Sequence, residues 1–390
     1  MNLMLPFIDF FENSANKLLF FILFVLLISS IYANAQPAEV TPRRAAGDMA
    51  TEFRNYRFSP STSPSPLPRR EPQGKEIEIV RQAQAIANNN PLLSMLLVDQ
   101  GEIIFEAYNA PAREDRPNFS WSMSKSLTAY TMGLANCETP TIDYNQQAEI
   151  YSDDLKGTVY GEATVRNLLT MSSGVRKAIS SGDHLFRKYN CTKGIDCDGW
   201  EMARSQKLSG VEYLHKVKER DISSGKEFRY SATDTLALSN ILDKNGGFIK
   251  QFEQHIWSRI GAESAGFWLL DKDNKAIAQA GFSAVSRDWA RLAMYTIKLK
   301  KSGTTCQQQF MNDATSPQIQ NYGSVGRLHR AYGYQTWINT SGPRISYWWL
   351  GYGGQRVAVD PEKERILVVT SFRESYMDQV GDLFYKWQRN

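Results

Sequence analysis

The residues best suited to covalent chemistry in this sequence are serines that precede a lysine by three positions. On a helix this spacing places both side chains on one face, where the lysine amine can take the proton of the serine hydroxyl. A serine activated in this way attacks ester or amide carbonyls. A helix cap beside a solvated lysine has the same spacing, so the surroundings must choose among candidates. The sequence contains three such pairs: Ser14/Lys17, Ser122/Lys125 and Ser223/Lys226.

The surroundings favour Ser122. Ser14 lies in an N-terminal leader, and Ser223 lies in a loop that a glycine interrupts. Ser122 follows a predicted strand and loop and opens an apolar helix over Leu127–Ala135. The free backbone N–H groups and the positive end of that helix would stabilise an oxyanion. We therefore predict Ser122 as the nucleophile and Lys125 as its base, because partial burial favours the neutral amine that accepts a proton.

Tyr230 is the third candidate. It lies in the short extended segment Phe228-Arg229-Tyr230-Ser231-Ala232, just before a predicted helix. A tyrosine hydroxyl held beside a serine and a lysine can pass a proton to the leaving group and later activate water. A tyrosine in this position also fits the core or a helix cap, so a packing role is the alternative to proton transfer.

The elements that must position these residues begin with a helix and a hairpin. The helix is predicted from Lys75 through Asn88. Two apolar runs, Leu92–Val98 and Glu102–Tyr108, then predict strands. The intervening Asp99-Gln100-Gly101 favours a hairpin turn.

After Pro117 the pattern changes to helices with long irregular connections, which predicts a helical lobe over about residues 120–285. The first helix of this lobe begins at Ser122, and two others cover Val165–Met171 and Asp234–Leu242. Strands at both ends with helices between them predict an α+β fold: a mostly antiparallel sheet flanked by the terminal helices, plus the lobe, with the site at their junction. The later elements are a helix over Ser286–Lys301, strands over Tyr332–Ile338, Arg344–Leu350, Gln355–Val359 and Arg365–Ser371, and a helix over Ser375–Gln388.

The N-terminus is predicted to be a secretory signal peptide over residues 1–35. The apolar stretch Leu18–Ile31 follows Lys17, and Ala33-Asn34-Ala35 offers a cleavage site before Gln36. The stretch is shorter than the roughly 20 residues that a spanning helix needs, so a retained anchor is the weaker alternative. We expect an exported protein, periplasmic or secreted, with no stable membrane span after cleavage.

Two further regions follow the leader. Residues 36–74, rich in Pro, Ser and Arg, predict a disordered linker, because such a composition buries little apolar surface. Residues 75–390 form the predicted catalytic domain. The cysteines, Cys137, Cys191, Cys197 and Cys306, permit up to two disulfides in an oxidising compartment, and their pairing stays open beside the alternative of buried thiols.

Composition excludes several function classes. The formal net charge of +4 over 390 residues includes no long basic run, so we expect no nucleic-acid partner. The histidines, His184, His215, His255 and His329, show no metal-ligand spacing, and no phosphate-binding glycine loop is present. A serine-lysine-tyrosine site needs neither metal nor cofactor, and we expect none.

Together the motifs resemble the family of class C β-lactamases, penicillin-binding-type esterases and 6-aminohexanoate-oligomer hydrolases. Ser122-Met123-Ser124-Lys125 resembles the family's nucleophile motif, and Tyr230-Ser231-Ala232 resembles its tyrosine motif. The similarity covers about residues 75–390 in the family's order and implies a β-lactamase/transpeptidase-like fold. Two supporting stretches also resemble the family: Leu168–Val175, after the nucleophile, and the closing strand pair at Gly351–Gln355 and Val359–Glu362.

Two departures from the family pattern bear on the substrate. The tyrosine motif of the family usually ends in asparagine, where this chain has Ala232. The family's strand motif, lysine-threonine/serine-glycine or histidine-x-glycine, is absent from Tyr347-Trp348-Trp349-Leu350-Gly351. Lys301-Ser302-Gly303 spells that motif but ends a predicted helix, with Gly303 as its cap. Loss of the motif lysine favours an esterase or amidase over a β-lactamase, unless Arg344 or Arg356 replaces the cation.

The second oxyanion N–H is predicted to come from the backbone between Gly351 and Gly353, where missing side chains let a carbonyl approach. Trp349 and Tyr352 are candidates to line an acyl pocket, with core packing as the alternative.

We therefore expect a serine hydrolase that forms an acyl-enzyme on Ser122 and hydrolyses a small-molecule carboxylic ester or amide. One alternative is a β-lactamase or D-amino-acid peptidase acting on cell-wall peptides. Another is a non-catalytic binding or sensor protein on the same fold, which the altered motifs would suit.

Overall fold

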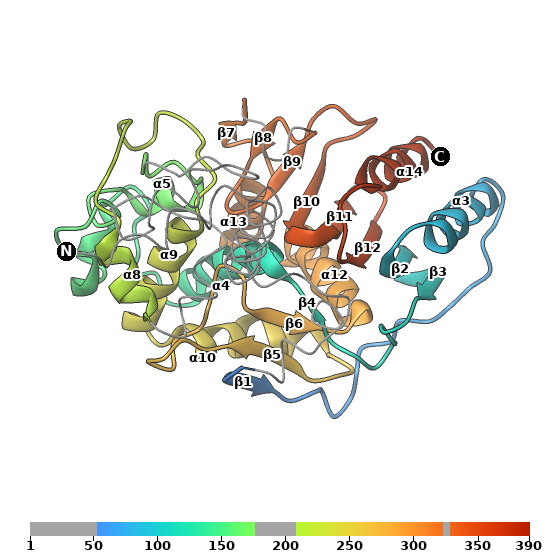
Figure 1. The fold of residues 1–390 in the computed structure, drawn as a ribbon, viewed down its shortest axis with the longest axis horizontal. Helices are drawn as coiled ribbons and strands as arrows, with labels where there is room; N and C mark the ends of the chain where they lie inside the picture. The colour runs from blue at the N-terminus through green and yellow to red at the C-terminus, as the bar shows by residue number, and fades with distance from the viewer. Residues whose placement is uncertain (1–52, 176–207, 323–327) are drawn as a thin grey trace, which may run out of the picture. The chain divides into compact units, whose positions relative to one another are not determined.

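The computed structural model describes residues 53–175, 208–322 and 328–390, which Figure 1 shows in colour. The predicted signal peptide, Cys191, Cys197 and His184 lie outside the described residues. In the part of the chain that is described, no helix combines the length and the apolar character needed to cross a membrane.

An eight-stranded antiparallel sheet runs through the described chain, in the order β3-β2-β12-β11-β10-β9-β8-β7. Strand β2 pairs with β12, so the beginning and the end of the domain meet within one sheet. The predicted hairpin turn between β2 and β3 is confirmed, with positive φ angles at Gln100 and Gly101. The strands are β2 (Leu92–Asp99), β3 (Glu102–Tyr108), β7 (Ile319–Gln320), β8 (Ala331–Tyr332), β9 (Trp337–Asn339), β10 (Ser346–Gly351), β11 (Gln355–Asp360) and β12 (Arg365–Ser371).

Helices cover both faces of this sheet. Along β2, Met95 and Leu97 belong to the core shared with α3 (Glu76–Asn89) and α14 (Met377–Arg389), which lie side by side (Figure 1). Leu96 and Val98 belong to the second core, which includes side chains of α12 (Ser286–Ser302). Alternate side chains of a strand point to opposite faces, so β2 is buried on both sides.

The remaining helices gather around α4 (Ser124–Glu138), which contacts α9, α10 and α13. The approach of α13 is close, because a Cβ added at Gly133 would lie 2.2 Å from the Phe310 ring. These helices and short turns are η2 (Trp121–Met123), η3 (Ala148–Ile150), η4 (Asp153–Leu155), α5 (Val165–Leu169), α8 (Gly210–Lys216), α9 (Ala232–Lys244), α10 (Phe248–Phe252), η5 (Glu253–Trp257), α11 (Ser258–Ile260) and α13 (Thr305–Ala314).

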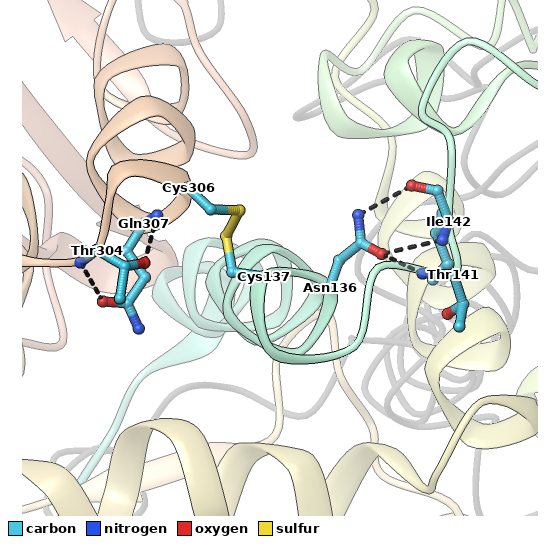
Figure 2. Close-up of a disulfide and its surroundings, with 7 residues drawn as sticks. All are labelled: Asn136, Cys137, Thr141, Ile142, Thr304, Cys306 and Gln307. Carbon is cyan, nitrogen blue, oxygen red and sulfur yellow. Dashed lines mark hydrogen bonds between the residues drawn. A yellow bond between two sulfur atoms is a disulfide. The ribbon is translucent and has the colours of Figure 1, made fainter.

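A disulfide joins α4 to α13 (Figure 2). Cys137, in the last turn of α4, bonds to Cys306, in the first turn of α13, across a sequence separation of 169. Thr304 and Gln307 form a capping box at the start of α13, and the Asn136 amide donates to the Ile142 carbonyl beyond α4 at 2.9 Å. The sequence left the pairing open, and the structure pairs two cysteines that lie far apart in the chain.

A second, four-stranded sheet follows the order β1-β5-β6-β4. Its strands are β1 (Asn55–Phe58), β4 (Asn118–Phe119), β5 (Gly266–Leu269) and β6 (Phe282–Ala284). The disordered linker predicted over residues 36–74 does not hold from residue 53 onward, because β1 pairs with β5 and Phe58 is fully buried. One buried aromatic and a strand partner anchor a stretch whose average composition suggests disorder.

The segment after β1 follows the free edge of β3. The Ile103 N–H donates to Pro68 O at 2.7 Å, and the Arg70 N–H donates to Ile103 O at 3.0 Å. The Arg70 guanidinium also pairs with Glu76 at 2.7 Å and with Asp99 at 2.8 Å. These contacts fix the segment between the two sheets.

The predicted α+β fold, an antiparallel sheet flanked by the terminal helices plus a helical lobe, is confirmed. One predicted strand is divided. Residues 332–338 form parts of β8 and β9 with a turn between them, in which Gln335 has a φ of 51°. The sequence pattern also missed the second sheet, whose strands are too short to show a clear alternation.

Candidate active site

Ser122 lies where the chain leaves β4 and turns into α4. The Ser120 N–H donates to Phe282 O at 2.9 Å, which fixes this segment against β6. Trp121 has a φ of 48°, in the left-handed region that non-glycine residues rarely occupy. Ser122 follows within η2, and α4 begins two residues later. Backbone strain of this kind is concentrated at functional sites, where the surrounding structure enforces it.

Lys125 places its amine beside the Ser122 hydroxyl. The distance from Nζ to Oγ is 3.1 Å, within hydrogen-bonding range. The Lys125 side chain is only 3% exposed, and Nζ also donates to the carbonyl of Gln279 at 2.8 Å. That carbonyl helps to orient the amine beside the serine hydroxyl. The pair has the separation and burial that proton transfer requires.

The segment before α9 brings Tyr230 to the same place. The Lys125 Nζ lies 5.3 Å from the centroid of the Tyr230 ring, and that ring stacks on Trp337 at 5.3 Å. Met171 holds the segment from behind: its carbonyl accepts from the Arg229 N–H at 2.7 Å, and its sulfur accepts from the Ser231 N–H at 3.1 Å. The structure thus brings together the side chains of Ser122, Lys125 and Tyr230.

Gln335 connects α4, which carries Lys125, to α5 and to α9, which follows the Tyr230 segment. Its backbone carbonyl accepts from Ser126 Oγ on α4 at 2.5 Å. Its side-chain amide donates to Leu168 O on α5 at 2.7 Å, and its Oε1 accepts from Thr235 Oγ1 on α9 at 2.7 Å. Sequence reasoning missed this fully buried residue. Its only signal was the polar Gln-Thr step within a run interpreted as one strand.

The end of β10 lies against the nucleophile segment from the sheet side. A Cβ added at Gly351 would lie 2.2 Å from Ser120 O, so only glycine fits there. The turn that follows has positive φ angles at Gly353 (74°) and Gly354 (92°). Tyr352, 63% exposed, meets the Trp121 ring edge-on at 5.5 Å. The predicted oxyanion backbone therefore adjoins the segment that carries Ser122.

Trp349 is placed in the core instead of a pocket. Its ring is fully buried, and its indole N–H donates to Tyr130 OH at 3.0 Å. It also packs edge-on against Trp289 of α12. The alternation along β10 sends Trp349 to the α12 side and its neighbours Trp348 and Leu350 to the opposite side.

The other candidate cations identified from the sequence have different partners in the structure. Lys301, at the end of α12, forms an ion pair with Glu364 in the turn after β11, so it has a structural partner. Gly303 does follow α12, although its backbone is extended and not left-handed. Arg344 pairs with the buried Asp360 at 2.8 Å. Arg356 instead turns back over the β10–β11 turn, where its Nη1 donates to Gly351 O at 2.8 Å.

Ala232 opens α9 and is buried, so the departure from the family pattern leaves a methyl group beside the tyrosine segment. Its neighbours are polar: the hydroxyl groups of Ser231 and Thr233 lie 2.7 Å apart. The Thr233 hydroxyl also accepts from Tyr160 OH at 2.5 Å, so hydroxyl groups surround the position where the family usually has an amide.

Comparisons with known proteins show the family of the chain and its fold. The model of the Beta-lactamase family matches residues 78–388. Among curated proteins, no sequence matches the chain.

Solved structures share the fold at low sequence identity. A protein assigned as a 6-aminohexanoate-dimer hydrolase from Bacillus anthracis superposes with a TM-score of 0.71 at 18% identity, covering 88% of this chain and 92% of that one. A D-stereospecific amidohydrolase from Streptomyces sp. gives a TM-score of 0.59 at 16% identity, over 79% and 98% of the two chains. A β-lactamase/D-alanine carboxypeptidase from Pseudomonas syringae gives 0.60 at 14% identity, over 81% and 98%.

Proposed function

The chain belongs to the Beta-lactamase family, and on that premise we propose that it is a serine hydrolase that forms an acyl-enzyme on Ser122 and hydrolyses a carboxylic ester or amide. Members of the family are serine hydrolases of esters, amides and peptides. The observation that carries the proposal is the buried Lys125 amine 3.1 Å from the Ser122 hydroxyl, with the Tyr230 ring beside it.

Acylation would begin when Lys125 takes the proton of Ser122 as Oγ attacks the substrate carbonyl. The negative charge that develops on the carbonyl oxygen would be held by the Ser122 N–H and by a backbone N–H between Gly351 and Gly353. Tyr230 would then give a proton to the leaving alcohol or amine, and the ester bond to Ser122 would remain.

Deacylation would reverse these roles. Water would enter in place of the leaving group, and the Tyr230 and Lys125 pair would take its proton as its oxygen attacks the acyl carbon. Collapse of the second tetrahedral intermediate would return the proton to Ser122 Oγ and release the carboxylic acid. The proton balance is then restored for the next cycle.

The preference for an ordinary ester or amide over a β-lactam rests on the residues of β10. The strand that carries the lysine motif in the family carries Trp348, Trp349 and Leu350 here, and Lys301 is paired elsewhere. Arg344 pairs with Asp360, and Arg356 donates to carbonyls of the β10–β11 turn. A β-lactam carboxylate would therefore lack the partner that the motif lysine provides. The similar structures named as amide hydrolases fit this preference.

Covalent labelling tests the nucleophile. Incubation with a fluorophosphonate followed by intact-mass measurement and peptide mapping should give an adduct on the peptide containing Ser122 and none on the Ser122→Ala variant. An unlabelled, inactive wild-type protein would favour a non-catalytic binding role. Adduct formation on another residue would overturn the assignment of Ser122.

Parallel assays test the substrate class. A short-chain p-nitrophenyl ester, a linear amide and a chromogenic cephalosporin should be compared on one preparation. We expect the ester or the amide to be turned over faster than the cephalosporin. The opposite order would identify a β-lactamase or cell-wall peptidase and reject the preference argued from the missing lysine.

Export is part of the proposal. The leader over residues 1–35 and the Cys137–Cys306 disulfide both fit a periplasmic or secreted protein, because disulfides persist in oxidising compartments. Mass spectrometry of the mature protein should show an N-terminus at or near Gln36, whereas a protein that retains the leader would indicate an anchor.

A further inference from the structure

Arg356 holds the peptide that follows Gly351. Its Nη1 donates to Gly351 O and to Gln355 O, each at 2.8 Å, so one guanidinium binds carbonyls on both sides of the β10–β11 turn. The side chain is 14% exposed, and its acidic neighbour Glu374 lies 3.8 Å away and is half exposed. The positive charge is therefore directed mainly at backbone carbonyls.

A cation on a carbonyl affects the N–H of the same peptide. The Gly351 C=O and the Tyr352 N–H belong to one planar trans unit and point in opposite directions. A charged donor makes a strong hydrogen bond to the carbonyl, and hydrogen bonds in series polarise one another. The Tyr352 N–H therefore faces away from Arg356 and becomes a better donor.

That peptide adjoins the nucleophile. Gly351 packs so closely on Ser120 O that no side chain fits between them, and Tyr352 contacts the Trp121 ring. We propose that Arg356 is a positioning residue that fixes and polarises the Gly351–Tyr352 peptide, so that the Tyr352 N–H can stabilise the oxyanion formed during attack by Ser122. This inference rests on the proposed serine-hydrolase function and deepens it.

The electrostatics of Arg356 also involve the tyrosine segment. Burial lowers the pKa of Arg356, and Glu374, Tyr376 and Tyr230 oppose that shift.

The test compares Arg356→Met, which removes the positive charge, with Arg356→Lys, which keeps a positive charge but loses the planar guanidinium group. Arg344→Met is the matched control, because Arg344 lies just before β10 and binds Asp360 at the end of β11 instead of the turn. The measurements are kcat and KM on a p-nitrophenyl ester, and the affinity of a boronic acid that mimics the tetrahedral intermediate.

Loss of one oxyanion donor costs about 10²–10³-fold in kcat, so weakening one by Arg356→Met should cost about 10–100-fold. KM should change little, and boronate affinity should fall in proportion to kcat/KM, because the interaction strengthens in the transition state. Arg356→Lys should recover part of the loss. Arg344→Met should lower the melting temperature without this kinetic pattern.

Two results would overturn the inference: unchanged kcat in Arg356→Met, or an equal loss of kcat in Arg344→Met, which would reduce the effect to general destabilisation. The proposed function fails in a different way, since a wild-type protein that neither turns over the ester nor accepts a fluorophosphonate would refute the hydrolase itself.

Discussion

The two sides of the candidate site use different parts of the chain. The helix side, made of η2, the first turn of α4 and the Tyr230 segment, presents the side chains of Ser122, Lys125 and Tyr230. The sheet side, made of the end of β10 and the turn over residues 352–354, presents mainly backbone. Proton transfer needs specific side chains, whereas an oxyanion needs only N–H groups at fixed positions.

This difference explains which motifs can vary. The helix side keeps the serine, lysine and tyrosine of the family, because no backbone group can replace an amine or a phenol. The sheet side has lost the family's motif lysine, yet Gly351 still packs against Ser120 O. A site can therefore look altered in sequence while the geometry needed for charge stabilisation is kept.

The largest effect is expected from a substitution on the helix side. Lys125→Met keeps the length of the side chain but removes the base, and should lower kcat/KM by about 10³–10⁴-fold. Lys300→Met is the control, because Lys300 is also partly buried but binds Asn312 and Thr315 away from the site. A loss below tenfold in Lys125→Met, measured with a p-nitrophenyl ester, would assign the base to another group.

The next test probes the sheet side. Gly351→Ala would force a methyl group to within 2.2 Å of Ser120 O and push the β10–β11 turn from the nucleophile segment, so kcat should fall by about 10²–10³-fold. Gly381→Ala in α14 is the matched control, since nothing lies within 4 Å of its added Cβ. Steady-state kinetics give kcat for both variants. Equal kcat values would show that the close contact between Gly351 and Ser120 O is dispensable.

A third test separates stability from chemistry on the helix side. The Cys137→Ser/Cys306→Ser double variant should lower the free energy of unfolding by about 2–5 kcal/mol, because it frees a loop spanning 169 positions in the unfolded chain. Its kcat should stay near that of the wild type at temperatures where it is folded. Urea unfolding followed by circular dichroism gives the first quantity. A large fall in kcat without unfolding would show that the far end of α4 also sets the position of Ser122.

The smallest effect is expected from a side chain on the sheet side. Tyr352→Ala removes an exposed ring but keeps its N–H, so kcat should fall by less than about tenfold. Tyr352→Pro removes the N–H and should cost about 10²–10³-fold in kcat. Similar kinetics for the two variants would show that the donor lies elsewhere in the turn.

The sequence predicted the helix side well, because its residues are close in the chain or lie in a recognisable order. Ser122 and Lys125 are three positions apart, in η2 and in the first turn of α4, and the helical backbone of these two elements brings them together. Backbone partners gave no such signal: the Gln279 carbonyl that binds Lys125 Nζ could be any residue type.

The sheet side was harder to predict, because strand register decides which side chains face the site. A one-residue shift exchanges the two faces. Trp349 therefore looked like a pocket residue but lies in the core, and the choice between Arg344 and Arg356 needed the structure. Gln335 was missed because its turn divides a run that resembles one strand.

The segment around Pro68 and Arg70 extends the folding unit toward the N-terminus, beyond the family match, which begins at residue 78. A chain trimmed to the matched residues would leave the outer strand of the large sheet with unsatisfied backbone groups, and unprotected edges of this kind recruit other chains. It would also take away the strand that completes the small sheet behind the nucleophile. Recombinant fragments and domain fusions should therefore start upstream of β1, although sequence similarity alone would place the cut after it.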